Sequence, residues 1–247
     1  MFGADDLTFK PLASSSAGCC YLLSGGGTAQ PLLIECGISM QRISRGLDYQ
    51  VTNLAGCLVS HAHGDHCHAV EGLVARGIDV YASRETWSSL PNAQNAYNAK
   101  TLEPRSDVMV GDWQVLPFEA IHDLPGTLGF VVGSPDGSRL LYLTDSMYSP
   151  FTFEGLTHLA VECNYSNEII RDNAESGAID RARYRRTMST HMSLETLVDL
   201  LKANDLSSVE AIYLLHLSSA NSDADLFRSR VQAATGCPTY VCQEATV

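Results

Sequence analysis

The stretch Leu58-Val-Ser-His-Ala-His-Gly-Asp-His-Cys67 decides the fold, because an apolar, strand-like run leads directly into four metal-binding side chains. His61 and His63 are two residues apart, so their imidazoles point to the same side of an extended segment. The glycine that follows permits a sharp turn, after which Asp65 and His66 fall on the first turn of a helix. Imidazole and carboxylate ligands suit zinc and similar ions, which favours a metal site over a histidine-rich surface loop.

The composition predicts one domain over residues 1–247 with a sizeable core, since 45% of the residues are hydrophobic. The formal charge of −12 argues against non-specific binding to nucleic acid or to an anionic membrane. Two bound divalent ions would, however, reverse the sign of the charge locally. No apolar run approaches the length that spans a membrane, so we expect no membrane partner.

The N-terminal segment and the cysteines predict a cytoplasmic protein. Residues 1–10 contain Asp5 and Asp6 and no apolar core, unlike a signal peptide. We therefore expect reduced thiols, which serve as small buried hydrophobic side chains more often than as ligands. The eight cysteines are Cys19, Cys20, Cys36, Cys57, Cys67, Cys163, Cys237 and Cys242.

The pattern of apolar residues and turn residues predicts an alternation of strands and helices. Strands are expected at 7–12, 20–23, 31–35, 56–60, 79–82, 107–110, 113–120, 128–132, 140–144, 159–162 and 211–215. Helices are expected at 39–47, 66–75, 84–90, 193–203 and 223–235, and a surface loop at 92–100. Ser193 and Asp223 are the expected N-caps of the last two helices. Two strand-rich halves, each ending in helices, predict two sheets packed face to face with helices outside.

Three later segments share one arrangement, in which an apolar strand ends in a single residue of a metal-binding type. His122 follows one such segment, Asp145 a second and His216 a third. A single residue at a strand end is more often a helix cap or a satisfied core residue. After the cluster at 61–66, however, these three supply the further ligands that two metal sites need.

The motif His61-x-His63-x-Asp65-His66, with the three later residues, resembles the metallo-β-lactamase superfamily over nearly the whole chain. The resemblance implies an α/β fold, a four-layer αββα sandwich of two mixed sheets with a two-metal site at one edge. It also implies a ligand set with Asp145 as the bridge between the ions. One ion would be bound by His61, His63 and His122, and the other by Asp65, His66 and His216.

Details of the sequence indicate to which branch of the superfamily the chain is most similar. Secreted β-lactamases have a cysteine where Asp145 stands, and diiron relatives have a glutamate where His63 stands. Five segments are similar to the YycJ/WalJ-type hydrolases, which are cytosolic phosphodiesterases with exonuclease activity on DNA and relatives of tRNase Z. These segments are 14–18, 35–37, 162–165, 190–193 and 216–221. The chain departs from that pattern at Cys19, Glu35, Met192 and Leu194, where Cys19 replaces an asparagine and Glu35 an aspartate.

The chemistry of such a site predicts two catalytic residues, Asp65 and His191. Two ions can lower the pKa of a bridging water to about 7 and stabilise an in-line displacement at phosphorus. The leaving alkoxide also needs a proton, and His191 matches the proton-donating histidine of tRNase Z-like enzymes. The alternative is that His191 is simply an exposed residue at the N-terminal turn of the helix. Asp123 is expected either to orient His122 or to cap a turn, and both readings stay open.

Substrate contacts are predicted from the basic run at 181–186, the one dense basic segment of an acidic chain. The alternative interpretation of this basic run is a solvated helix face whose charge is balanced by nearby acidic residues. The helix N-terminus at Ser193 offers backbone N–H groups to a phosphate, and Tyr184 could stack on a base. The predicted substrate-binding residues are Arg183, Arg185, Ser193 and Asn221.

The sequence thus predicts a dinuclear metal-dependent phosphodiesterase that acts on DNA ends or short oligonucleotides, with zinc favoured and manganese as the alternative. The chain lacks an insertion for a tRNA-gripping arm, which argues against tRNA maturation. Hydrolysis of a cyclic nucleotide, a thioester or another ester, and a noncatalytic nucleic-acid-binding role, are the alternatives. The sequence leaves open whether the protein forms a homodimer.

Overall fold

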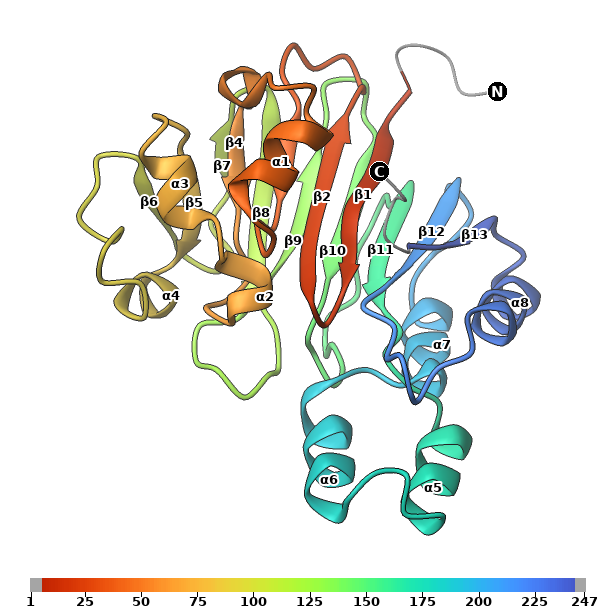
Figure 1. Ribbon diagram of the computed structural model, residues 1–247. Coiled ribbons are helices and arrows are strands. Elements are labelled where there is room, and N and C mark those ends of the chain that lie inside the picture. Colours follow the sequence, from red (N-terminus) through yellow and green to blue (C-terminus); the bar gives the residue numbers. More distant parts are fainter. Residues whose placement is uncertain (1–5, 243–247) are drawn as a thin grey trace. The chain divides into compact units, whose positions relative to one another are not determined.

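The computed structural model describes residues 6–242 (Figure 1). These residues divide into two compact units. Within the described residues, unit one contains 6–119 and 124–139, and unit two contains 120–123 and 140–242. The expectation of one domain stays a prediction. The interpretation that the chain lacks a signal peptide rests on residues 1–10. Of these, residues 1–5 lie outside the described residues. Within 6–242, no helix is long and apolar enough to cross a bilayer.

Unit one is built on a six-stranded mixed sheet in the order β1-β2-β3-β4-β5-β6. The first three strands pair antiparallel, as expected of a meander, and β3 to β6 pair parallel. A register shift between Pro11 and Ala13 marks a bulge, where proline cannot donate to the ladder. The strands are β1 (Thr8–Ser15), β2 (Gly18–Ser24), β3 (Leu32–Ile34), β4 (Gly56–Leu58), β5 (Val80–Ser83) and β6 (Ala99–Leu102).

Unit one also contains three antiparallel strands and several short helices. The strands are β7 (Val108–Val110), β8 (Trp113–Glu119) and β9 (Leu128–Gly133). The helices are α1 (Met40–Gly46), the 3₁₀ turn η1 (Val51–Asn53), α2 (Gly64–Cys67), α3 (Val70–Val74) and α4 (Arg84–Ser88). Ser39 caps α1 by accepting a hydrogen bond from the Arg42 N–H.

Two predictions for unit one were wrong in detail. The helix expected at 66–75 is broken into α2 and α3, because the Ala69 N–H donates to the Cys36 carbonyl at 2.9 Å instead of continuing the helix. The loop expected at 92–100 ends in β6, an edge strand of which only Leu102 is fully buried. Such a strand lacks the apolar alternation by which strands are recognised.

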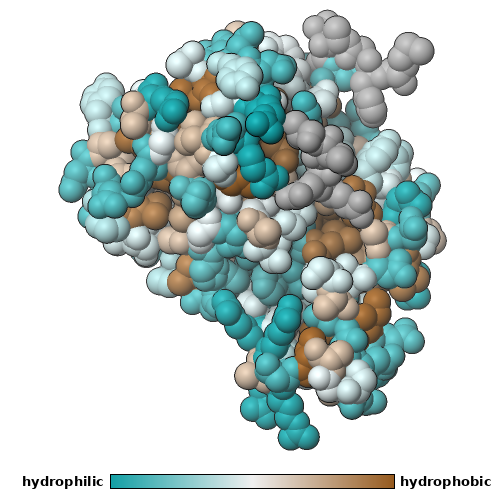
Figure 2. All heavy atoms as spheres, in the orientation of Figure 1, coloured by the Kyte–Doolittle hydropathy of each residue, from teal (hydrophilic) through white to brown (hydrophobic). Residues whose placement is uncertain are grey.

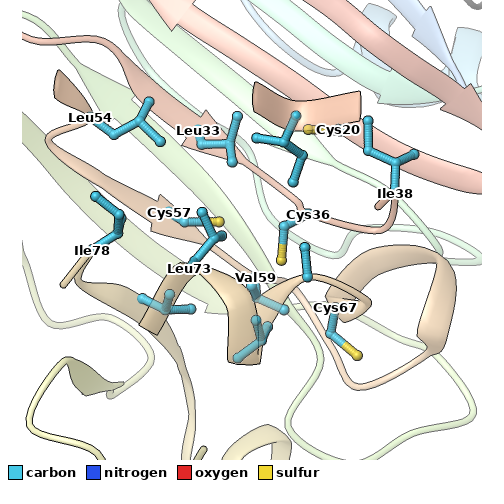
Figure 3. Close-up of a cluster of buried hydrophobic side chains, with 14 of the residues drawn as sticks. Cys20, Leu33, Cys36, Ile38, Leu54, Cys57, Val59, Cys67, Leu73 and Ile78 are labelled. Carbon is cyan, nitrogen blue, oxygen red and sulfur yellow. The ribbon is translucent and has the colours of Figure 1, made fainter. Parts of the chain in front are cut away.

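The core of unit one contains several cysteines among aliphatic side chains (Figure 3). Burial raises the pKa of the Cys20 and Cys57 thiols well above their ordinary value, so these side chains stay protonated. All eight cysteines lie within residues 6–242 and are buried, which confirms the expectation of small buried side chains.

Unit two is built on parallel strands with four helices. The strands are β10 (Arg139–Leu143, from Leu140 in this unit), β11 (His158–Glu162), β12 (Ala211–Leu215) and β13 (Thr239–Val241). The helices are α5 (Asn167–Glu175), α6 (Arg181–Thr190), α7 (Leu194–Lys202) and α8 (Ala224–Thr235). The N-caps predicted at Ser193 and Asp223 are confirmed. The sequence did not predict α5 or β13, because α5 buries one residue completely and β13 has three residues.

A tight backbone contact fixes the start of α2 in unit one. The Gly37 N–H donates to the Cys19 carbonyl at 2.8 Å, and a Cβ built on Gly37 would overlap the Asp65 carbonyl oxygen. The segment after β3 therefore packs directly against the turn that carries Asp65 and His66.

Replacing Gly37 with alanine should lower the free energy of unfolding by about 2–3 kcal/mol, because backbone has to move to admit the methyl group. Urea denaturation measures this. Gly64→Ala is the control, since no heavy atom lies within 4 Å of a Cβ built there. Alanine in this helical position should be neutral or stabilising by up to about 1 kcal/mol. Equal stability of the Gly37→Ala variant and the wild type would contradict the assigned contact.

Candidate metal centre

Unit one presents the histidine motif on the loop between β4 and α2. His61 is fully buried, and its Nε2 lies 3.0 Å from the Nδ1 of His63. The Ser60 hydroxyl lies 2.8 Å from the Nδ1 of His61, which fixes the orientation of that ring. The two imidazoles therefore lie on the same side, as their spacing predicts. Asp65 and His66 lie on the single turn of α2, also as predicted.

A buried carboxylate, Glu35, supports the second half of this motif. Its carboxylate accepts a hydrogen bond from the Ser60 N–H at 3.3 Å, and its Oε1 lies 3.5 Å from the Nδ1 of His66. The Nε2 of the same ring lies 3.7 Å from an Asp65 oxygen. Glu35 thus orients His66 from behind, as carboxylates commonly do for metal-binding histidines.

Unit two is organised around a second buried carboxylate, Glu162, at the end of β11. It accepts hydrogen bonds from the Nδ1 of His191 at 2.6 Å and the Nδ1 of His216 at 3.0 Å. The backbone N–H groups of Ser146 and Met192 donate to it at 3.2 and 3.1 Å. Burial acts to raise the pKa of Glu162, but the charge of His191 and these hydrogen bonds outweigh burial and lower it.

His191 follows α6, and one fifth of its side chain is exposed (20%). Burial acts to lower its pKa, whereas the charge of Glu162 and the short hydrogen bond raise it, and the net shift is upward. A histidine that keeps its proton near neutral pH can act as a general acid.

The three predicted ligands of unit two lie together. Asp145 contacts two imidazoles, with 3.3 Å from Oδ1 to the Nδ1 of His216 and 3.8 Å from Oδ2 to the Nε2 of His122. The ligand-type atoms of Asp145, Glu162, His191 and His216 lie within 4.8 Å of one another, so this group could hold a metal ion.

The orientation of His122 comes from the backbone rather than from Asp123. Its Nδ1 lies 3.0 Å from the Thr190 carbonyl, which directs Nε2 toward Asp145. Asp123 lies 3.1 Å from that same Nε2 and also pairs with Arg186 at 3.4 Å. Asp123 thus lies beside Nε2, and the group that accepts from Nδ1 is the Thr190 carbonyl.

The structure therefore groups His61, His63, Asp65 and His66 in unit one, and His122, Asp145, His191 and His216 in unit two. The four predicted substrate-binding residues have different environments. Arg183 and Arg185 are exposed on α6, whereas Ser193 is buried and caps α7. Asn221 is buried and accepts a hydrogen bond from the Asn173 side chain. Substrate contacts by these four residues stay predictions.

Sequence reasoning missed Glu162 and Arg186 as site residues. Glu162 follows the same arrangement as the recognised ligands, an apolar strand that ends in a residue of a metal-binding type, and could have been found by it. Arg186 belongs to the predicted basic run, but its contact with Asp123 spans 63 positions and leaves no local signal.

Comparison with known proteins places this site in a family. Residues 31–217 match the family model described as the beta-lactamase superfamily domain. The chain belongs to the beta-lactamase superfamily. It is 27% identical over 239 residues to an exodeoxyribonuclease YycJ of Bacillus anthracis, covering 91% of this chain and 88% of that one. It is 21% identical over 254 residues to a ribonuclease Z of Methanococcus maripaludis, covering 81% of this chain and 82% of the relative.

A solved structure confirms the fold class. The metallo-β-lactamase fold protein YhfI of Bacillus subtilis matches with a TM-score of 0.70 and 16% identity, covering 96% of each chain. The α/β fold, the superfamily and the relationship to YycJ predicted from the sequence are thereby confirmed, as is a hydrolase. The superfamily implies divalent metal ions, and the imidazole and carboxylate groups described here fit them.

Replacing Glu162 with glutamine should lower the free energy of unfolding by about 3 kcal/mol, because the amide places a donor against two imidazole donors and removes a buried charge. Urea denaturation in the presence of chelator measures this effect without metal. Glu119→Gln is the matched control, since its pair with Arg105 is exposed and should contribute less than about 1 kcal/mol. Equal losses in the two variants would contradict the role assigned to Glu162.

Proposed function

We propose that this protein is a dinuclear metal-dependent phosphodiesterase that degrades DNA as an exonuclease. The observation that carries the proposal is the 2.6 Å hydrogen bond between His191 and the buried Glu162, within the same group as Asp145 and His216. The similarity to an exodeoxyribonuclease and a ribonuclease supports a phosphodiester substrate.

The proposed metal ligands are the seven residues that the superfamily motif assigns. Divalent ions bound by them would lower the pKa of a water molecule and offset negative charge on the phosphate. Asp65 belongs to this set and is thereby also a proposed catalytic residue. The set is His61, His63, Asp65, His66, His122, Asp145 and His216.

His191 is the proposed general acid. Glu162 holds its Nδ1 and raises its pKa, so the imidazolium can donate its Nε2 proton to the leaving oxygen. An alkoxide is a poor leaving group and gains from this proton. A thioester or an activated aryl ester gains less, which favours a phosphodiester of a nucleic acid as the natural substrate.

A basic groove on the α5–α6 hairpin supports a nucleic-acid substrate. The groove measures about 440 Å³ and includes three arginines and a tyrosine, with Glu175 as its acidic member. Hydrophilic side chains gather over α6 (Figure 2). Arginine side chains bind backbone phosphates, and tyrosine can stack on a base. The groove is lined by Arg171, Ala174, Glu175, Arg181, Tyr184 and Arg185.

The reaction class is tested with bis-p-nitrophenyl phosphate, a 5′-phosphorylated DNA duplex and a 3′,5′-cyclic nucleotide, each with Zn²⁺ or Mn²⁺ and with chelator. We expect chelator-sensitive hydrolysis, with DNA as the preferred natural substrate. Asp65→Ala and Asp145→Ala should each abolish turnover while circular dichroism shows an intact fold. Preference for the cyclic nucleotide would replace the nuclease proposal, and no cleavage of any substrate by the metal-loaded protein would overturn it.

Replacing His191 with alanine should slow DNA hydrolysis by about 10²- to 10⁴-fold, the usual contribution of a general acid. Hydrolysis of bis-p-nitrophenyl phosphate should change far less, because p-nitrophenolate leaves without a proton. His68→Ala is the control, since His68 is exposed beside the histidine motif and is not a proposed ligand. An equal loss on both substrates would indicate that His191 acts in another way, for example as a ligand.

Replacing Arg181 and Arg185 together with alanine should weaken duplex binding by about tenfold or more and reduce the log–log salt slope by about two. Fluorescence anisotropy of the Asp145→Ala background, which should not cleave the probe, measures both quantities. The matched control replaces Arg228 and Arg230 of α8. If both double variants lose the same affinity, the groove has no specific role in binding.

A further inference from the structure

Cys19, the second residue of β2, lies beside the histidine motif of unit one. Its side chain is fully buried, and its sulfur lies within 4.8 Å of a ring nitrogen of His66. The thiol donates a weak hydrogen bond to the Ser15 carbonyl at 3.5 Å.

Backbone contacts hold Cys19 at this place. The Gly37 N–H donates to the Cys19 carbonyl at 2.8 Å, and the Cys36 N–H donates to the His66 carbonyl at 2.9 Å. Gly37 also touches the Asp65 backbone so closely that no side chain fits between them. The start of β2 and the ligand turn are therefore parts of one packed arrangement.

We propose that Cys19 is a metal ligand in unit one, which binds a thiophilic divalent ion together with Asp65 and His66. This inference rests on the proposed metal-dependent function. It adds a thiolate that the superfamily motif does not contain, at a position where the related sequences are expected to have asparagine.

Cys19 and Asp65 each lie near a ring nitrogen of His66, the residue with which both would share one ion. Zinc binds sulfur at about 2.3 Å and nitrogen at about 2.0 Å, so two such ligands in a tetrahedral site lie roughly 3.6 Å apart. The sulfur of Cys19 lies within 4.8 Å of the His66 nitrogen, and an Asp65 oxygen lies 3.7 Å from the Nε2 of the same ring.

The neighbouring thiols have other surroundings. Cys67 follows His66 directly, yet its thiol donates to the Ala62 carbonyl at 3.4 Å and packs in the core cluster (Figure 3). Cys20, next to Cys19, also lies in that cluster. Within residues 6–242, Cys19 is the cysteine found in a group that could hold a metal.

A thiolate ligand would decide the choice of metal. Sulfur is a soft ligand that favours zinc, cobalt and cadmium over manganese and magnesium. The mixed sulfur, nitrogen and oxygen donors of Cys19, His66 and Asp65 would therefore select zinc, where the ligands of the motif alone leave manganese open.

Spectroscopy of the full-length protein, stripped of metal and then titrated with Co²⁺, tests the inference directly. The wild type should show a thiolate-to-cobalt charge-transfer band in the near ultraviolet. Cys19→Ala, and Cys19→Ser if the alanine variant is unstable, should lose the band, whereas Cys67→Ala should keep it. In competition between Zn²⁺ and Mn²⁺, Cys19→Ala should lower the preference for zinc by about 10- to 100-fold.

A band that persists without Cys19, or a wild type that binds cobalt without the band, would overturn the inference. Absence of cobalt binding by the wild type would overturn it as well. Hydrolysis of bis-p-nitrophenyl phosphate separates this result from the proposed function. If the Cys19→Ala variant has unchanged metal preference and normal hydrolysis, the proposal that Cys19 is a ligand is wrong and the proposed phosphodiesterase function stands. If the band depends on Cys19 but the protein hydrolyses no substrate, Cys19 is a ligand and the proposed phosphodiesterase function is wrong.

Discussion

The hydrogen bonds accepted by the buried Glu162 carboxylate are the interaction on which unit two depends. Two imidazoles and two backbone N–H groups converge on this side chain from three separate segments of the chain. An isolated carboxylate without water would cost several kcal/mol, so the charge is tolerated only because every donor is in place. The same bonds orient His191 and His216 and set the pKa of the first. Stability and chemistry therefore depend on one residue.

Glu35 has the corresponding position in unit one. It is fully buried, it accepts from the backbone at Ser60, and it faces the Nδ1 of His66. Each unit thus places a buried carboxylate against the Nδ1 of a histidine, and in unit one the opposite nitrogen, the Nε2 of His66, faces Asp65. Such pairs fix the tautomer and orientation of an imidazole before any ion binds.

Backbone strain accompanies this organisation. Glu35, Asp145 and His216 each have a positive φ, at 62°, 45° and 52°, although none is glycine. Such conformations cost on the order of 1–3 kcal/mol each and persist where the surroundings determine them. Asp145 and His216 follow β10 and β12, where the chain has to turn sharply to present a side chain at the strand end. Three of the six non-glycine residues with positive φ within residues 6–242 therefore belong to the groups around the histidines, and the other three are Asp48, Tyr49 and Arg105.

The sequence by itself determined the features that depend on near neighbours. The two-residue spacing of His61 and His63, the turn that follows, and the caps at Ser193 and Asp223 are local relationships that the residues specify directly. Only the tertiary structure decided which distant groups complete them. The Thr190 carbonyl that orients His122 is 68 positions away, and the Cys36 carbonyl that ends α2 belongs to another segment. Contacts of this kind form when separate elements pack together. Because every residue has a backbone carbonyl, the sequence does not indicate which carbonyl will make the contact.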